Sequence, residues 1–536
     1  MGSLLKRLEA SVSTPAAAPA LFVGALVVYA LESVAVPVTA GRDLQTYIVN
    51  YLQLGDWKAA VPIWSLLRTP LASLSVGAPL ELGGAWLAQA LLGVLFAASI
   101  TAWARTAAYF GSRAAIATAA VLLLDPGHSI LFHQDGADSV SAAAFSGLAL
   151  LAARAAVRPS TRRFAAVGLG VGLATLVRPT NEPLVLLILL AVIAPSARKW
   201  KAVFAIAFIA AAAVLPVAWA VNNRIRYHDF ALVRGMNLVF GRAFLDGLVS
   251  PRNGPASAEL ARVVNERLLK EEPYRSYRIT PRQFWTEDHS FRMLVDLNVL
   301  SDRVWGWDSD YAILKRAGRE AVAEHPGKFV GGVIKTLGWD LLSTVAAPIP
   351  VPPTSASPPQ GVPASAGGGP EQLPRPTEGD VIPSSRESRI VSTPDDSIKE
   401  VWTSPTVHNI VFKRPADTRR FGELNVQTAQ LISELPPYTG RASLIHRFDQ
   451  AARAFPPAIV WLLAGLAAVG IRRPRRSGFL LTLAGAAFVT LLAIATGVGE
   501  TVGEYVVPLV PAFVLLTTAG LFGSRGSAAV EAKRGR

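Results

Sequence analysis

Apolar stretches recur along the chain with the length of membrane-spanning helices. A span needs roughly 20 apolar residues, within a range of about 17–25. Ten apolar stretches occur, seven before a long polar region and three after it. The third and the sixth are short as written, but each can be lengthened into its flanks or lie tilted. They are residues 17–40, 82–104, 114–124, 140–156, 164–177, 183–194, 203–221, 456–471, 479–497 and 506–522. The pattern predicts an all-α polytopic membrane protein with about ten transmembrane helices and a large extracytoplasmic region of mixed or irregular structure.

Lysine and arginine are distributed unevenly between the two sides of these spans. The short segments on one side hold 19 of them, and those on the other side hold four, namely Arg42, Lys58, Arg68 and Arg178. Cytoplasmic loops are enriched in Lys and Arg, so the asymmetry predicts that both termini are cytoplasmic. The first stretch exceeds the apolar part of a cleaved signal peptide, about 7–15 residues, and therefore predicts a retained anchor. The Arg- and Ala-rich composition is typical of a GC-rich bacterial genome, so we expect a multi-pass protein of the bacterial plasma membrane.

Residues 329–347 are also fairly apolar, but they contain Lys335 and Asp340. A span here would move the basic segment 472–476 to the outer side, against the charge asymmetry. We therefore predict an interfacial or re-entrant helix, and an extracytoplasmic location for everything between about residue 222 and residue 455.

A proline-rich stretch divides this outer region, because such a segment cannot pack a core and is typical of a flexible linker. The predicted organisation has five parts. They are a membrane domain with seven transmembrane helices (1–221), an extracytoplasmic region with the interfacial helix (222–347), a Pro-rich linker (348–383), a second extracytoplasmic segment (384–455), and a membrane domain with three transmembrane helices and a cytoplasmic tail (456–536).

Composition excludes several classes of function. Only 17% of the 536 residues are charged, which argues against a disordered chain and an ordinary soluble enzyme. The chain has no cysteine, so disulfides, thiolate metal sites and cysteine nucleophiles are excluded. The net charge of +14 is explained by cytoplasmic loops that face anionic lipids. Because no compact basic domain exists, we expect membrane lipids as partners and no nucleic acid.

Acidic residues gather at the opposite, outer side of the predicted spans. Asp43 follows the first span by a few residues, beside interfacial residue types such as Tyr47 and Trp57. A carboxylate at the membrane boundary is costly unless it faces a cavity or a partner. Asp43 could thus meet a lipid-linked substrate on one side and an acceptor on the other. The alternative is an ordinary solvated carboxylate beside Arg42.

The second outer loop concentrates groups that can bind a metal or carry a proton, namely His128, His133, Asp135 and Asp138. Their spacing matches no established metal motif. In a simpler interpretation, Asp138 or Ser139 caps the helix that begins near residue 140. No cofactor is firmly predicted, and a divalent cation stays an open alternative.

Arg178 is the only basic residue of the third short outer loop. An arginine at the membrane boundary can clamp a lipid phosphate, or its side chain can simply extend to the headgroups. The glycines at 168, 170 and 172 look like a phosphate loop on paper. They lie in the middle of a predicted span with no strand before them, so they predict close helix packing instead.

The order of several motifs resembles the GT-C class of integral-membrane glycosyltransferases. The motifs are "GRDLQTYIVNYLQLGDW" after the first span, "PLASL" before the second, "HQDGADSVSAAAFSGLALLAARA" opening the fourth, "ATLVRPTNEPLVLL", "AVAEHPGKFVGGVIKTLGWDLL" in the outer region, and the closing "EYVVPLVPAFVLLTTAGLF". Protein mannosyltransferases and lipid A aminoarabinose transferases are the most similar groups. The resemblance covers about residues 15–345 and the last span, and it rests on order and spacing.

The resemblance implies a polyprenyl-phosphate sugar as donor and inversion at the anomeric carbon, with a glycan, lipid or protein as acceptor. It implies Asp43 as the catalytic base, Asp138 as a second acidic position, and Arg178 as a residue near the donor phosphate. One position departs from the pattern. Relatives often carry Arg-Tyr at the start of the last span, where this chain has Glu504 and Tyr505.

Other interpretations remain at this point. In the outer region, Trp285, Trp305, Trp307 and Tyr311 either bind the acceptor or form a core. A secondary transporter or lipid flippase would need inverted repeats and charges near span centres, but the spans carry few charges, with Glu32 the main exception. A non-catalytic scaffold for envelope assembly is the third alternative.

Overall fold

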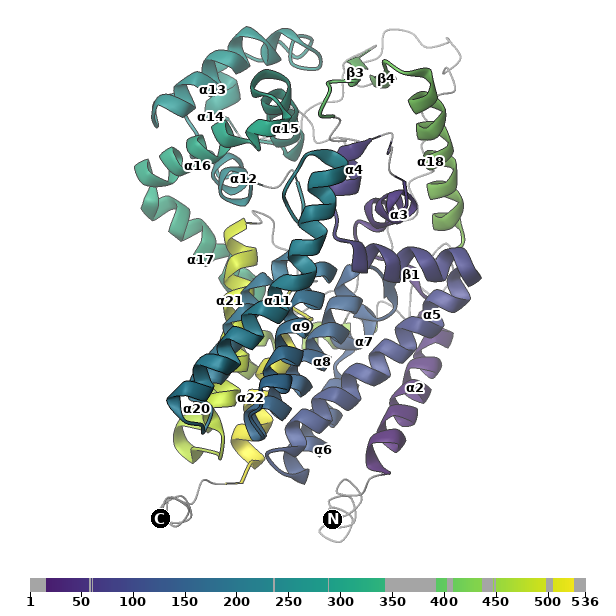
Figure 1. The fold of residues 1–536 in the computed structure, drawn as a ribbon, viewed down its shortest axis with the longest axis vertical. Helices are drawn as coiled ribbons and strands as arrows, with labels where there is room; N and C mark the ends of the chain where they lie inside the picture. Colours follow the sequence, from purple (N-terminus) through teal and green to yellow (C-terminus); the bar gives the residue numbers. More distant parts are fainter. Residues whose placement is uncertain are drawn as a thin grey trace.

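The computed structural model describes residues 16–56, 59, 61–234, 237–287, 289–342, 392–402, 408–435, 447, 450–497 and 505–524. The structure is helical, and its strands form two short two-stranded sheets within these ranges (Figure 1). The helices form an elongated bundle with a separate group of helices at one end. This architecture confirms the all-α membrane class that the apolar pattern predicts.

Six helices of the described chain are long and apolar enough to cross a membrane. They are α2 (Ala17–Ala35), α5 (Pro70–Ala108), α8 (Ala137–Val157), α11 (Arg198–Tyr227), the helical stretch Gln450–Arg472 that ends with α20 (Ala458–Arg472), and α21 (Ser477–Gly497). The four remaining apolar stretches coincide with shorter helices. These are α6 (Ser112–Leu124), α9 (Thr161–Val177), η1 (Pro179–Ile188) continued by α10 (Leu189–Ile193), and α22 (Val510–Phe522). The number of ten spans stays a prediction.

The helices α9 and α11 pack closely because glycines replace side chains at their contact. A Cβ atom on Gly168 would lie 2.1 Å from the carbonyl oxygen of Phe208, and one on Gly172 would lie 2.8 Å from that of Ala212. Both distances are too short for a real side chain. The prediction that these glycines serve helix packing is therefore confirmed.

The last span packs against the first half of the chain. The hydroxyl groups of Thr118 on α6 and Thr518 on α22 are 2.7 Å apart. Hydrogen bonds also join the turns that the charge asymmetry assigns to the cytoplasm. The Arg475 N–H donates to the Ser524 carbonyl and the Ser524 N–H donates to the Phe110 carbonyl, each at 3.0 Å. The loops of one predicted side thus gather at one end of the bundle.

Helix α5 bends sharply near the opposite end. Gly83 and Gly84 have non-helical backbone angles, and φ of Gly84 is +59°, a conformation that favours glycine. The bend lets the first part of α5 run across the bundle while the rest runs along it (Figure 1). Helix α3 (Leu44–Gln53) packs on the first part, where the Tyr51 ring occupies the space beside Gly77. The bend therefore builds a platform at this end of the bundle.

The separate group of helices corresponds to the first outer region. It contains α12 (Leu238–Leu245), α13 (Pro255–Glu266), η2 (Leu268–Lys270), α14 (Pro281–Thr286), α15 (Phe291–Trp305), η3 (Trp307–Ser309), α16 (Ala312–Glu324) and α17 (Pro326–Leu342). Trp285, Trp307 and Tyr311 are at most 5% exposed and belong to hydrophobic cores. Of the two roles open to these aromatics, the structure assigns these three to a core.

Helix α17 covers most of the segment for which we predict an interfacial helix, and residues 343–347 lie outside the described ranges. Its inner face packs on α21 and α20. Val330, Ile334, Trp339 and Leu342 are exposed on the other face. An exposed apolar face with a tryptophan suits a helix that lies at the membrane surface.

The second outer segment is described only in part, and the Pro-rich linker 348–383 lies outside the described residues. Strands β3 (Ile398–Trp402) and β4 (His408–Phe412) pair antiparallel, and α18 (Pro415–Ser433) follows and packs on α3. A separate hydrophobic core joins these elements to α4 (Pro62–Leu66), α3 and the end of α11. This segment therefore rests on the same platform as α3.

The predicted orientation can be checked by labelling, because the chain has no native cysteine. Cysteine at Ala258, which is exposed on α13, should react with a membrane-impermeant thiol reagent in intact cells. Cysteine at Ser477, the first residue of α21, should react only after the membrane is permeabilised. The reverse pattern would contradict the orientation inferred from the charge asymmetry.

Candidate active site

Two loops that are distant in sequence are joined by a short parallel strand pair, at the end of the bundle that the charge asymmetry predicts to be extracytoplasmic. Strand β1 (Thr39–Ala40) pairs with β2 (Gln134–Asp135), and the Gly41 N–H donates to the Asp135 carbonyl at 2.9 Å. Helix α3 begins immediately after β1, and α8 begins immediately after β2. The pairing therefore brings the starts of both helices to the same region, with Asp43 just before α3 and Asp138 in the first turn of α8.

Asp43 is the residue before α3 and has a left-handed backbone, with φ of +59°. Asp and Asn tolerate this conformation better than most residues. Its carboxylate forms an ion pair with Arg68 at 2.8 Å, and the Asp43 side chain is 41% exposed. Arg68 also donates to the Thr46 hydroxyl at 2.8 Å and lies over the Tyr47 ring. Asp43 is thus held in place and remains accessible.

A second ion pair joins Asp138 to Arg178. Asp138 lies in the first turn of α8, and the N-cap residue of that helix is Gly136, which corrects the expectation that Asp138 or Ser139 caps it. The Ser139 hydroxyl donates instead to the Gly136 carbonyl. Arg178 directly follows α9, and each side chain of the pair is 13% exposed. The pair is therefore more buried than the one formed by Asp43.

The aromatic ring of Tyr505 connects the two ion pairs. The guanidinium carbon of Arg178 lies 4.6 Å from the ring centre, and that of Arg42 lies 5.5 Å from it. Arg42 is also the chain neighbour of Asp43, which pairs with Arg68. Tyr505 precedes α22, and its neighbour Glu504 lies outside the described residues. Four separate segments thus bring three arginines and two carboxylates around one ring.

His133 and Asp135, the other site residues predicted in the second outer loop, take part in neither ion pair. His133 packs flat on the Tyr29 ring, with ring centres 4.4 Å apart, and its Nε2 lies 3.7 Å from a carboxylate oxygen of Glu32. Asp135 is only 2% exposed, and burial raises the pKa of its carboxyl group to about 8. Burial therefore disfavours the charged form of Asp135, and this carboxyl group belongs to neither ion pair.

A metal site is not supported in this region. In the ranges the structure covers, no three His, Asp or Glu side chains are grouped in a way that could hold a metal ion. His133, Asp135 and Asp138, which are close in sequence, have three different environments. The compact cluster in the sequence is therefore divided by the fold.

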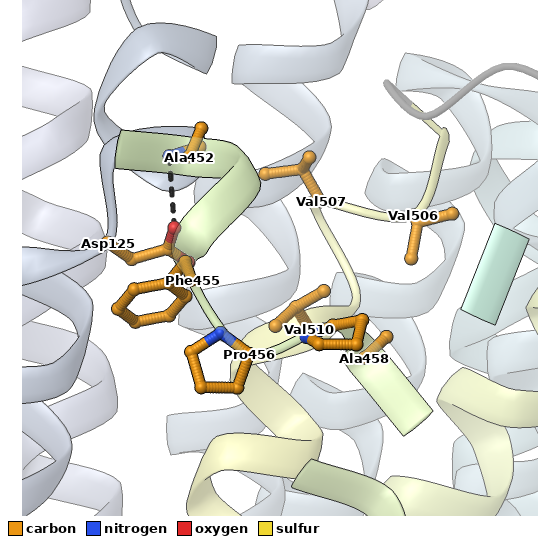
Figure 2. A pocket seen from close by; sticks show the side chains of 10 residues that line it. Asp125, Ala452, Phe455, Pro456, Ala458, Val506, Val507 and Val510 are labelled. Atoms are coloured by element: carbon orange, nitrogen blue, oxygen red, sulfur yellow. Dashed lines mark hydrogen bonds between the residues drawn. The ribbon is translucent and has the colours of Figure 1, made fainter. Parts of the chain in front are cut away.

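A small pocket lies next to this region (Figure 2). Its walls come from the start of α7 (Pro126–Leu131), the segment 452–458, and Val506, Val507 and Val510. Asp125 is its only acidic wall residue, and this carboxylate caps α7 by accepting from the Gly127 N–H at 2.9 Å. The pocket is thus mostly apolar, and none of the residues of the two ion pairs lines it.

Sequence reasoning selected Asp43, Asp138 and Arg178 separately, and the structure brings them around Tyr505. It missed Arg68 and gave Arg42 and Tyr505 no role in a site. A signal for the arginines was present, because Arg42, Arg68 and Arg178 are three of the four basic residues in outer short loops. Basic residues that break the charge asymmetry are candidates for a site.

Residues 80–221 match the family model described as dolichyl-phosphate-mannose-protein mannosyltransferase. No curated protein sequence matches the chain. Two solved structures of ArnT from Cupriavidus metallidurans are similar to it. The structure bound to undecaprenyl phosphate matches 95% of this chain and 78% of the ArnT chain, at 14% identity and with a TM-score of 0.34. The apo structure matches 94% of this chain and 77% of the ArnT chain, at 16% identity and with a TM-score of 0.32.

The family match begins near the predicted second span and ends with the seventh, so it includes Asp138 and Arg178 but neither Asp43 nor Tyr505. It agrees with the motif order, which extends beyond the matched segment on both sides. The matched segment and the motif order agree, and both make this chain similar to GT-C class integral-membrane glycosyltransferases.

Proposed function

We propose that the protein moves a sugar from a polyprenyl-phosphate donor to a cell-envelope acceptor on the extracytoplasmic face of the plasma membrane. The donor class follows from the family description, which names a dolichyl-phosphate-linked sugar, and dolichol is a polyprenyl-type lipid. The reaction is a single displacement that inverts the anomeric carbon. The acceptor is a glycan, a lipid or a protein that carries a nucleophilic hydroxyl group.

The observation that carries this proposal is the gathering of both ion pairs around Tyr505. An accessible carboxylate can accept a proton, and arginines beside it can bind a phosphate through paired hydrogen bonds. Both carboxylates lie where α3 and α8 begin, at the end of the bundle that is predicted to be extracytoplasmic. The arrangement therefore suits a reaction between a lipid-anchored phosphate and a water-soluble or surface-bound acceptor.

Each group has a defined role in the proposed step. Asp43 accepts the proton of the acceptor hydroxyl while the oxygen forms a bond to C1 of the sugar. The bond between C1 and the phosphate oxygen breaks, and polyprenyl phosphate leaves with the electron pair. Arg178 leaves its ion pair with Asp138, binds the donor phosphate instead, and stabilises the negative charge of the departing phosphate. Most of the acceleration comes from orientation and charge stabilisation, because an aspartate is a weak base.

The charges of the site agree with this chemistry. Three guanidinium groups and two carboxylates leave one net positive charge among Arg42, Arg68, Arg178, Asp43 and Asp138. A sugar phosphodiester carries one negative charge, so it matches the site before reaction. The released phosphate monoester gains negative charge, about −1.5 to −2 in total near neutral pH. When Asp43 takes up the acceptor proton, the site gains one positive charge, which balances this increase.

The proposal can be tested with purified protein in nanodiscs. The probes are polyprenyl phosphates that carry mannose, glucose or an aminosugar, with a bacterial envelope extract as acceptor, and mass spectrometry measures released polyprenyl phosphate. We expect sugar-dependent release by the wild type and none by a protein with both Asp43→Asn and Arg178→Ala. If no donor is consumed while liposomes with the protein move lipid or protons, the transporter or flippase interpretation replaces this one.

Tyr505 should act through its ring rather than its hydroxyl group. The ring face attracts the guanidinium groups of Arg42 and Arg178, and Phe offers a similar face. Tyr505→Phe should keep the donor KM within about twofold, whereas Tyr505→Leu should raise it by about 2- to 30-fold, since a cation–π contact contributes roughly 0.5–2 kcal/mol. Steady-state kinetics with varied donor measures both. Equal damage in the two variants would assign the role to the hydroxyl group.

A further inference from the structure

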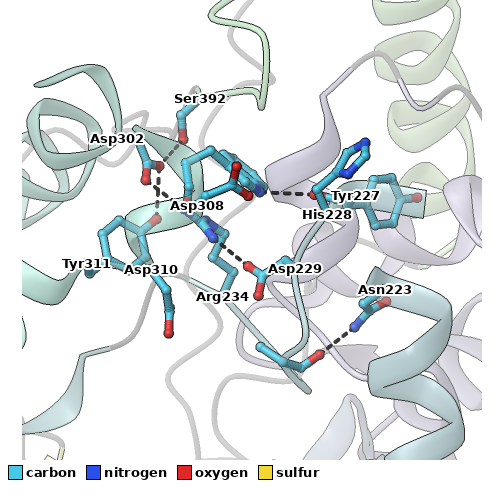
Figure 3. Close-up of polar contacts among 12 residues, drawn as sticks. Asn223, Tyr227, His228, Asp229, Arg234, Asp302, Asp308, Asp310, Tyr311 and Ser392 are labelled. Atoms are coloured by element: carbon cyan, nitrogen blue, oxygen red, sulfur yellow. Dashed lines mark hydrogen bonds and ion pairs between the residues drawn. The ribbon is translucent and has the colours of Figure 1, made fainter. Parts of the chain in front are cut away.

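A cluster of charged side chains is buried where the chain leaves the membrane domain after α11 (Figure 3). The Arg234 side chain is 1% exposed and forms ion pairs with Asp229 at 2.6 Å and with Asp302 at 2.7 Å. Its guanidinium carbon lies 3.7 Å from the ring centre of Trp307 and 4.7 Å from that of Tyr311. We call these five residues and Ser392 the Arg234 junction.

Ser392 brings the second outer segment into this junction. Its hydroxyl group donates to Asp302 Oδ2 at 2.7 Å, and the Tyr311 hydroxyl donates to the same oxygen at 3.1 Å. Ser392 is the first described residue after the Pro-rich linker and is 5% exposed. Asp302 therefore connects three parts of the chain, which are α15, the loop after α11, and the segment that begins with Ser392.

The junction also contacts the turn that carries Arg68. The backbone N–H of Arg234 donates to the Leu66 carbonyl at 2.8 Å, two residues before Arg68. On its other side, this turn receives a hydrogen bond from the Asn50 amide of α3 to the Ser65 carbonyl at 2.7 Å. The turn is thus fixed between the junction and α3, the helix that begins beside Asp43.

Stability alone is a poor explanation for such a cluster. Two carboxylates and one guanidinium leave a net negative charge at a site where all three side chains are at most 4% exposed. Burial raises the pKa of Asp302 even though Arg234 opposes this change. Buried ion pairs are often no more stable than apolar groups of the same volume, and a fixed geometry is a better attested use for them.

We propose that the Arg234 junction is a positioning device through which the second outer segment sets the location of Arg68, and through Arg68 that of the Asp43 carboxylate. This inference rests on the proposed function, because it assumes that Asp43 is the base. Arg234, Asp302 and Ser392 are positioning residues that do not touch substrate. The second outer segment, residues 392–435, thereby takes part in transfer from a distance.

The variant Ser392→Ala is a small change to the junction, because it removes one hydrogen bond and leaves the ion pairs of Arg234 intact. We expect kcat to fall about tenfold, since small displacements of reacting groups are costly, with the donor KM within about twofold of the wild type. Ser397→Ala is the matched control. Ser397 is equally buried in the same segment, but its hydroxyl group bonds to Thr393. It should leave kcat unchanged.

A double-mutant cycle separates positioning from general damage. If Ser392 acts through Arg68, Ser392→Ala should have no further effect on kcat in a protein that already carries Arg68→Ala. Equal losses in both backgrounds would overturn the proposal. So would a loss of kcat that Ser397→Ala reproduces, or one explained by a lower unfolding temperature.

Hydrogen exchange measured by mass spectrometry provides a readout that needs no activity. Ser392→Ala should speed the exchange of peptides that cover residues 61–69, and Ser397→Ala should not. If this difference is seen but the wild type consumes no polyprenyl-linked sugar, the junction stands and the proposed function fails. If the wild type is active but neither kcat nor exchange responds to Ser392→Ala, the junction proposal fails alone.

Discussion

Asp43→Asn should lower sugar transfer by about 100-fold or more, the usual contribution of a general base. Asparagine keeps the size and hydrogen-bonding ability of the side chain, but it cannot accept the acceptor proton. It also tolerates the left-handed backbone found at this position, which alanine would not. The measurement is release of polyprenyl phosphate at saturating donor by the purified variant.

The fold should survive this change. The ion pair between Asp43 and Arg68 is partly exposed, and such pairs contribute about 0–1 kcal/mol to stability. Asp308→Asn is the matched control, since that carboxylate is 83% exposed in the outer region and belongs to no proposed site. It should leave transfer and unfolding temperature unchanged. Near-normal transfer by Asp43→Asn would show that Asp43 is not the base, and Asp138 would become the next candidate.

Arg178→Ala should act mainly on the donor. It removes a charge-assisted contact to the phosphate, which is worth about 1.5–3 kcal/mol, so the donor KM should rise about tenfold or more. Arg178→Lys should recover only part of this loss, because an ammonium group does not provide two parallel hydrogen bonds. Initial rates at varied donor concentration, at fixed acceptor, measure the change.

Asp138→Asn provides the comparison for this prediction. It removes the partner that Arg178 has in the present structure but leaves the guanidinium group available to a phosphate. Its effect on the donor KM should be smaller than that of Arg178→Ala. A fall in kcat with an unchanged donor KM in Arg178→Ala would instead mean that Arg178 orders the site without binding the donor phosphate.

The membrane part of the fold was predictable because its physical signal is strong and local. An apolar run long enough to span a bilayer has few alternatives to a helix, and each of the ten predicted stretches overlaps a helix of the structure, although the first also extends into β1. The break in α5 was not predicted. Gly83 and Gly84 stand next to each other within an otherwise continuous helix, and the sequence does not say in which direction the chain turns.

The site was only partly predictable, because its parts meet through packing between distant segments. Asp43, Asp138 and Arg178 could be selected from their place at the membrane boundary. Their grouping depends on the pairing of β1 with β2 and on the return of α22 to the first half of the chain. For the aromatic residues of the outer region, the sequence did not decide between acceptor binding and a core. The structure places Trp307 in a core, where its ring packs on Arg234.

The place of Tyr505 near the end of the chain has a consequence for biogenesis. During synthesis at the ribosome, Asp43 and Arg68 enter the membrane early, and Arg178 follows with the fifth predicted span. The ring that gathers Arg42 and Arg178 arrives only with the final span, which closes on α6 through Thr118 and Thr518. A nascent chain therefore inserts most of its helices before the ring that Arg42 and Arg178 contact is present.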